Sequence, residues 1–205
     1  MRLGLLASGR GSNVQAILEA VRDGRLDAQP VVLVCDRWGA PVLEIAQRFR
    51  LPIQILARSA FQTRAAHQEA IRDALQRDRV ELVALAGFAA ILDAVVVEAF
   101  EGRILNIHPS LLPAFAGTMA PEPQAAALRT GVTLTGCTVH LVTTEVDAGP
   151  IVAQSTVPVL PDDSVETLSA RILAEEHRLY PEVLQWFAQG RVSIAVGGQI
   201  HVAEG

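Results

Sequence analysis

Two patterns of apolar and polar residues alternate along the first half of the chain. Five short apolar runs have the pattern of strands: 2–7, 30–35, 52–56, 80–86 and 103–107. The run 80–86 is continuous, as expected for a strand that is covered on both faces. Four segments between them have apolar residues three or four positions apart, as on one face of a helix: 13–23, 40–49, 62–77 and 92–100. This order predicts an α/β fold with a mostly parallel, twisted sheet and helices on both of its faces.

After Pro113 the pattern changes. Gly and Pro recur over 114–127, which predicts a loop, and we expect a short helix over 124–129. Two further apolar runs, 136–143 and 151–158, flank a segment rich in turn-forming residues. This arrangement predicts a C-terminal antiparallel hairpin that is added to the parallel sheet.

A long amphipathic segment then closes the regular part of the chain. Apolar positions over 164–189 predict a helix, with Ser164 as its N-cap and Gly190 just after its end. The pattern weakens beyond this point to one faint strand. We therefore expect a single domain over residues 1–190, followed by a C-terminal tail over 191–205.

Composition narrows the classes of function. The chain has 205 residues, 50% of them hydrophobic, and a formal net charge of −5 without a basic block, which argues against a nucleic-acid partner. No apolar run is long enough to cross a membrane. The two cysteines, Cys35 and Cys137, lie in apolar runs, which suits a reducing, cytoplasmic compartment. No Cys/His spacing of the zinc type is present, so we expect no metal.

The strongest candidate for chemistry is the exit of the fifth apolar run. Asn106 and His108 are two residues apart there, so both side chains face the same side of the predicted strand. An amide donor beside an imidazole can bind a developing oxyanion and move a proton at neutral pH. Pro109 and Pro113 restrict the backbone that follows. These features predict an active site.

A glycine-containing connection, residues 8–13, follows the first strand. Its glycines let the backbone approach a ligand, and the free N–H groups at the start of the next helix favour an anion. Gly9 and Gly11 also begin a dinucleotide-binding fingerprint, and Asp36 ends the second strand, but Val14 occupies the place of the third glycine. A phosphate monoester is therefore favoured over a dinucleotide, and a simple capped turn is the remaining alternative.

Several stretches together resemble the glycinamide ribonucleotide formyltransferase family. The resemblance covers roughly residues 1–190. The matching stretches are Ser8-Gly9-x-Gly11-Ser12-Asn13, Leu85-Ala86-Gly87-Phe88, Leu105 to Pro113, Gly136-Cys137-Thr138-Val139-His140, Asp147-x-Gly149-Pro150-Ile151, and Glu176-His177 with Tyr180-Pro181. The resemblance implies a Rossmann-like formyltransferase fold.

The resemblance also implies a reaction, the transfer of a formyl group from 10-formyltetrahydrofolate to the amine of glycinamide ribonucleotide in de novo purine biosynthesis. The implied catalytic residues are Asn106, His108 and Asp147. The implied ribonucleotide-binding residues are Gly11, Ser12, Asn13 and Glu176. The implied folate-binding residues are Arg64, Ala89, Ala90, Ile91, Leu92, Thr143, Thr144, Glu145 and Val146.

Charge arguments add one expectation about the implied catalytic group. A carboxylate close to an imidazole favours the cationic form, so we expect Asp147 to raise the pKa of His108 and to orient its ring. His140 lies in an apolar strand run and is as readily interpreted as a core histidine, and Arg64 as a solvated charge on a helix.

Two segments depart from the family pattern. The loop over 117–128 is longer than usual and lacks the family's histidines. Ala90 stands where the family often has Arg, which predicts weaker affinity for the anionic end of the folate. A deformylase-like hydrolase and a catalytically weakened ligand-binding homologue remain the alternatives. The pattern leaves both a monomer and a homodimer open.

Overall fold

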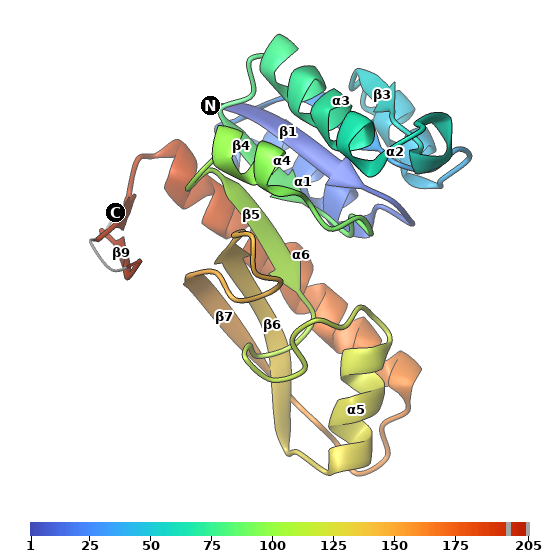
Figure 1. Ribbon diagram of the computed structural model, residues 1–205. Helices are drawn as coiled ribbons and strands as arrows, with labels where there is room; N and C mark the ends of the chain where they lie inside the picture. The colour runs from blue at the N-terminus through green and yellow to red at the C-terminus, as the bar shows by residue number, and fades with distance from the viewer. Residues whose placement is uncertain (196–197, 204–205) are drawn as a thin grey trace. The chain divides into compact units, whose positions relative to one another are not determined.

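The computed structural model describes residues 1–195 and 198–203. Within these ranges, seven strands form one sheet in the order β3-β2-β1-β4-β5-β6-β7 (Figure 1). Their bounds are β1 Arg2–Ala7, β2 Gln29–Cys35, β3 Ile53–Ile55, β4 Leu82–Leu85, β5 Ile104–His108, β6 Leu134–Leu141 and β7 Ile151–Pro158. The first five strands pair in parallel, and β6 pairs with β7 in antiparallel fashion. The predicted α/β fold is confirmed.

The helices follow the predicted order along the chain (Figure 1). Their bounds are α1 Ser12–Arg22, α2 Val42–Arg48, α3 Arg64–Arg77, α4 Ala94–Ala99, α5 Glu122–Thr130 and α6 Val165–Ala188. Figure 1 shows α1 and α2 on one face of the first strands and α3 and α4 on the other. Because both faces are covered, β1 and β4 are almost entirely buried apolar runs.

Packing divides the chain into two compact units, Met1–Asn106 and Ile107–Gly205. The first contains β1 to β4, α1 to α4 and most of β5. The second contains the end of β5, α5, α6 and the β6–β7 hairpin. The expectation of a single domain over 1–190 stays a prediction.

Helix α6 begins as its sequence predicts. The Ser164 hydroxyl accepts a hydrogen bond from the Thr167 N–H, and the Thr167 hydroxyl accepts one from the Ser164 N–H. Thr167 thereby takes the role that Glu usually has in a capping box. The helix ends at Ala188, just before Gly190, whose φ of +67° suits a residue without a Cβ.

Apart from small shifts in where strands and helices begin and end, the structure differs from the expectation at three places. A 3₁₀ turn over Arg58–Ala60 follows β3. Helix α5 begins at Glu122, because Pro123 fits the first turn of a helix, so the loop ends earlier than expected. The tail contains two short antiparallel strands, β8 (Val192–Ile194) and β9 (Ile200–Val202), where one was expected.

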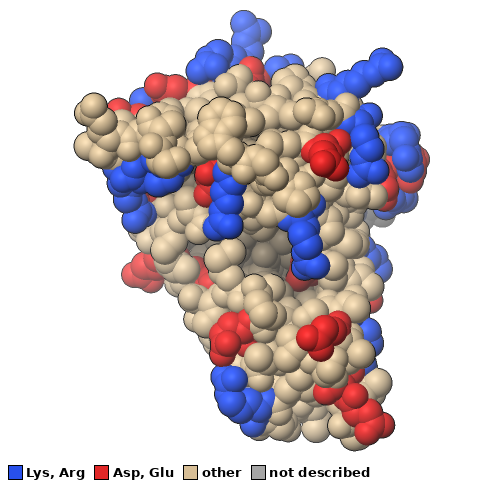
Figure 2. All heavy atoms as spheres, turned by 90° about the vertical axis from the view of Figure 1, so that its right-hand side faces the viewer, with Lys and Arg blue, Asp and Glu red and all other residues tan. Residues whose placement is uncertain are grey.

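None of the helices in the described ranges combines the length and the hydrophobicity needed to cross a bilayer. Positive and negative side chains are interspersed over the surface shown in Figure 2.

The connection between β1 and α1 is packed tightly against α2. Gly11 has a φ of +77°, and a Cβ added there would lie 2.4 Å from Cγ2 of Val42. The Val42 N–H donates to the Gly9 carbonyl at 3.1 Å. Glycine at position 11 therefore satisfies both a left-handed backbone and a close approach.

We expect Gly11→Ala to lower the free energy of unfolding by about 2–5 kcal/mol, since left-handed strain costs about 1–2 kcal/mol and overpacking about 1–3 kcal/mol. In a Val42→Ala background the cost should fall only in part, because the contact with Cγ2 is removed while the contacts of the added Cβ with Cβ and Cα of residue 42, at 2.6 and 3.0 Å, remain. Urea denaturation followed by circular dichroism checks both values. Equal costs in the two backgrounds would contradict the packing argument.

Candidate active site

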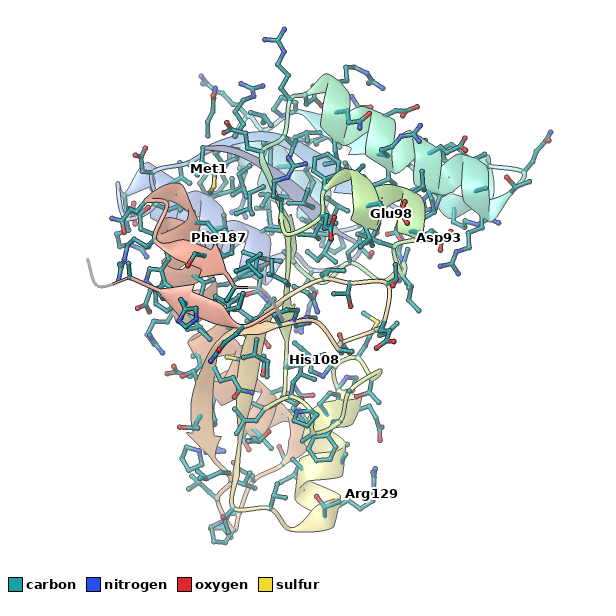
Figure 3. The ribbon with its side chains drawn as sticks, turned by 60° about the vertical axis from the view of Figure 1, so that its left-hand side comes forward. Met1, Asp93, Glu98, His108, Arg129 and Phe187 are labelled. Atoms are coloured by element: carbon teal, nitrogen blue, oxygen red, sulfur yellow. The ribbon has the colours of Figure 1, made fainter. Side chains whose placement is uncertain are left out.

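Strand β5 carries the amide and the imidazole that the sequence singled out. Asn106 lies opposite Leu85 of β4 and is half-buried, and His108 is the last residue of the strand and only 3% exposed. Strand alternation places both side chains on one side of β5. Figure 3 labels His108 where the strand runs into the following loop.

Asp147 lies beside His108 in the second unit. Its Oδ2 is 3.4 Å from Nδ1 of His108, and its Oδ1 is 3.6 Å from Nε2 of His140. The Gly117 N–H donates to Oδ2 at 2.8 Å. The carboxylate, whose side chain is 11% exposed, is therefore surrounded by donors from three segments. The expected proximity of Asp147 and His108 is confirmed.

The backbone around Asp147 explains its neighbours in the sequence. Asp147 has a φ of +54°, a left-handed conformation that Asp tolerates better than most residues. A Cβ added to Gly149 would lie 1.9 Å from the Leu141 carbonyl oxygen. The Leu141 N–H donates to the Pro150 carbonyl at 2.9 Å. Gly149 thus lets the chain return onto the end of β6 directly after the carboxylate.

Burial sets the pKa of His108. Desolvation lowers the pKa and outweighs the opposing effect of the Asp147 charge. His140 lowers it further, and the Phe115 carbonyl raises it. The expectation that the Asp147 charge raises the pKa of His108 is confirmed for that one effect, but burial outweighs it and the net pKa lies below the usual value of 6.5. The carboxylate opposes the shift but does not reverse it.

The two ring nitrogens of His108 have different surroundings. Nδ1 faces the Asp147 carboxylate, which assigns the proton of the neutral ring to Nδ1. Nε2 is buried and makes no hydrogen bond within the described residues. A buried polar atom without a partner is costly, so Nε2 offers a lone pair to an incoming polar group.

Asp147 stays ionised at neutral pH. Burial alone would raise its pKa, but the hydrogen bonds from His140 and the Gly117 N–H, together with the charge of His108, lower it below its usual value. The carboxylate therefore remains available to stabilise a positive charge on His108.

Thr138 holds the loop that follows His108. Its hydroxyl donates to the Ser110 carbonyl at 2.7 Å and accepts from the Leu112 N–H at 3.0 Å. The Gln154 amide donates to the Leu112 carbonyl and to the Thr138 hydroxyl at 3.1 and 2.9 Å. Sequence reasoning gave Thr138 and His140 no role. Their spacing of two on a buried strand, which puts both on one face, was the available signal.

The connection after β1 forms an open helix N-terminus in the first unit. Gly11 is the N-cap of α1 and makes no side-chain capping bond, and the first turn carries no acidic residue. Ser12 and Asn13 are the first two residues of the helix. These features suit an anion, and the structure provides no side-chain cap in its place.

The residues implied for the folate fall into two sets, one in each unit. In the first, Arg64 forms an ion pair with Asp93 and donates to the Ile91 carbonyl at 3.2 Å, so it contacts the 89–93 segment directly. In the second, residues 143–146 form an exposed turn that leads to Asp147. Glu176 is buried on α6. No group of three or more potential metal ligands occurs among the residues with described positions.

Comparison with known proteins places this site in a family. The formyl transferase family model matches residues 1–184. The chain is 39% identical to the phosphoribosylglycinamide formyltransferase of Bacillus subtilis over 184 residues, which are 90% of this chain and 93% of the relative.

The chain belongs to the phosphoribosylglycinamide formyltransferase family.

Other proteins of this kind are also similar to the chain. The crystal structure of glycinamide ribonucleotide transformylase 1 from Symbiobacterium toebii is 46% identical, with a TM-score of 0.95, covering 100% of this chain and 94% of that chain. The human trifunctional purine biosynthetic protein adenosine-3 is 40% identical over 97% of this chain. This chain spans only 19% of the length of that trifunctional relative.

Replacing the Asp147 carboxylate tests the electrostatic account. In Asp147→Asn the opposing charge is lost while the side-chain shape remains, so we expect the pKa of His108 to fall further below 6.5. NMR titration of the His108 ring protons measures this value in both proteins. A higher pKa in the variant would contradict the argument.

Proposed function

We propose that the chain transfers the formyl group of 10-formyltetrahydrofolate to the amine of glycinamide ribonucleotide in purine biosynthesis. The names of its relatives support this reaction. The single observation that carries the proposal is the state of His108, with a buried, unpartnered Nε2 and with Nδ1 directed at an ionised Asp147. That arrangement suits a group that accepts and returns one proton.

Asn106 is the proposed oxyanion donor. Attack of the ribonucleotide amine on the formyl carbon forms a carbon–nitrogen bond and places negative charge on the formyl oxygen. An uncharged amide stabilises this charge without changing its own protonation state. Asn106 lies two residues before His108 on β5, so both groups can act on one reacting centre.

His108 is the proposed proton carrier. Neutral Nε2 takes a proton from the attacking amine as the new bond forms, and the resulting imidazolium is stabilised by Asp147. The same proton then goes to the folate nitrogen as its bond to the formyl carbon breaks. This cycle returns His108 to its neutral form and needs no covalent intermediate with the protein.

A thiol nucleophile is disfavoured by the state of Cys137. Burial, with a smaller effect from Glu176 and Glu175, raises the pKa of the Cys137 thiol to about 12. The thiolate is therefore scarce at neutral pH. Both cysteines are free and buried, which is compatible with our proposal of a cytoplasmic enzyme.

The binding residues are assigned to the two substrates in the same proposal. Gly11, Ser12 and Asn13 bind the ribonucleotide phosphate, supported by the uncapped start of α1, and Glu176 contacts the ribonucleotide. The residues proposed for the folate are Arg64, Ala89, Ala90, Ile91, Leu92, Thr143, Thr144, Glu145 and Val146. The weaker affinity expected from Ala90 stays a prediction.

Turnover of formylfolate with and without the ribonucleotide tests the reaction. We expect folate release only when glycinamide ribonucleotide is present, with one formylated ribonucleotide formed per folate released. Release without the ribonucleotide would instead indicate a deformylase. Tight binding of both ligands with no release would indicate a binding protein.

The role of Asp147 is tested by the kinetics of Asp147→Asn. We expect kcat to fall by about 10²- to 10⁴-fold, the usual contribution of proton-transfer catalysis, because the imidazolium loses its counter-charge. Asp162→Asn is the matched control, since Asp162 is an exposed carboxylate in the turn before α6. A variant at position 147 with wild-type kcat would refute this role.

A further inference from the structure

The segment Gly87–Asp93 is tied to the end of β1 by one residue. The Ser8 N–H donates to the Gly87 carbonyl at 2.9 Å, and the Ser8 hydroxyl accepts from the Ala89 N–H at 2.6 Å. Ser8 is 4% exposed. Because β1 and β4 are adjacent parallel strands, the connections after them begin side by side, and Ser8 bridges these connections.

The far end of the same segment is tied to α3. The Gln68 amide donates to the Ile91 carbonyl at 3.2 Å and accepts from the Asp93 N–H at 2.9 Å, and Gln68 is 1% exposed. Arg64 adds its ion pair with Asp93, which Figure 3 labels at the start of α4. The segment is therefore held at both ends by hydrogen bonds. A restraint applied at Ala89 is for this reason transmitted along the segment to Asp93.

Ser8 also begins the connection that leads to α1. Gly9 accepts a hydrogen bond from Val42, and Gly11 packs against the same residue, so this connection has little freedom of its own. The buried Ser8 side chain thus contacts the segment proposed for the folate, residues 89–92. The backbone of Ser8 continues into residues 11–13, which are proposed to bind the phosphate.

We propose that Ser8 is a positioning residue that couples the two substrate segments. An anion held by residues 11–13 removes the motion that remains in the connection, and the Ser8 hydroxyl passes this restraint to Ala89 and the segment up to Asp93. Coupling between two binding sites is reciprocal, so each ligand strengthens the other by the same factor. This inference rests on the proposed function, because it uses the two segments as substrate sites.

The test is the affinity for tetrahydrofolate with and without saturating glycinamide ribonucleotide, measured by calorimetry. Neither ligand carries a formyl group, so no turnover occurs. We expect the ribonucleotide to tighten folate binding by at least about fivefold in the wild type, a usual coupling strength. In Ser8→Ala the factor should fall to near one, because Ala89 loses its acceptor.

Two further variants separate coupling from general damage. Ser8→Thr retains the hydroxyl and should keep the factor. Ser59→Ala changes an exposed serine in the 3₁₀ turn after β3 and should also keep it. The proposal would be overturned by a folded Ser8→Ala protein in which the ribonucleotide tightens folate binding as much as in the wild type. It would also be overturned if the ribonucleotide did not change the folate affinity of the wild type.

Hydrogen exchange keeps the proposal testable if Ser8→Ala fails to fold. In the wild type, the ribonucleotide alone should slow amide exchange in the peptide that covers residues 87–93. Unchanged exchange there, with the ribonucleotide bound, would overturn the coupling. Absence of ribonucleotide binding would instead count against the proposed function, and so the two failures are distinguishable.

Discussion

The largely enclosed Asp147 carboxylate, whose side chain is 11% exposed, is the constraint that joins several segments of the second unit. A buried charge is costly unless donors surround it, and here the donors come from His108, His140 and the Gly117 backbone. These three come from the end of β5, from β6 and from the loop before α5. Satisfying one carboxylate therefore fixes the relative positions of three segments that are distant in the sequence.

The parts of the fold that the sequence predicted are those with strong local patterns. The limits of elements depended on hydrogen bonds that the pattern does not reveal. Strand β4 begins at Leu82 and not at residue 80, because the Val80 N–H bonds to the Leu75 carbonyl and so belongs to the end of α3. Arg79, with a φ of +52°, makes that turn. An apolar residue at such a turn is easily mistaken for the start of a strand.

The candidate site was predictable to the same extent. The spacing of Asn106 and His108 on one strand was visible in the sequence, and the resemblance implied Asp147. The direction of the net His108 pKa shift could not be predicted from the sequence. It depends on whether the effect of burial on the pKa is larger than the effect of the nearby charge, and burial is a property of the folded chain. The contact of Gly117 with Asp147 spans 30 residues and follows from no local pattern.

The lowered pKa of His108 also clarifies why a carboxylate is beside it. A neutral imidazole can accept a proton. An imidazole whose pKa had been raised above neutral pH would already carry that proton. In the proposed reaction, the same carboxylate would stabilise the imidazolium, which burial alone disfavours. Asn106 and His108 both belong to β5, so chain connectivity along one strand keeps the proposed oxyanion donor two residues from the proposed proton carrier.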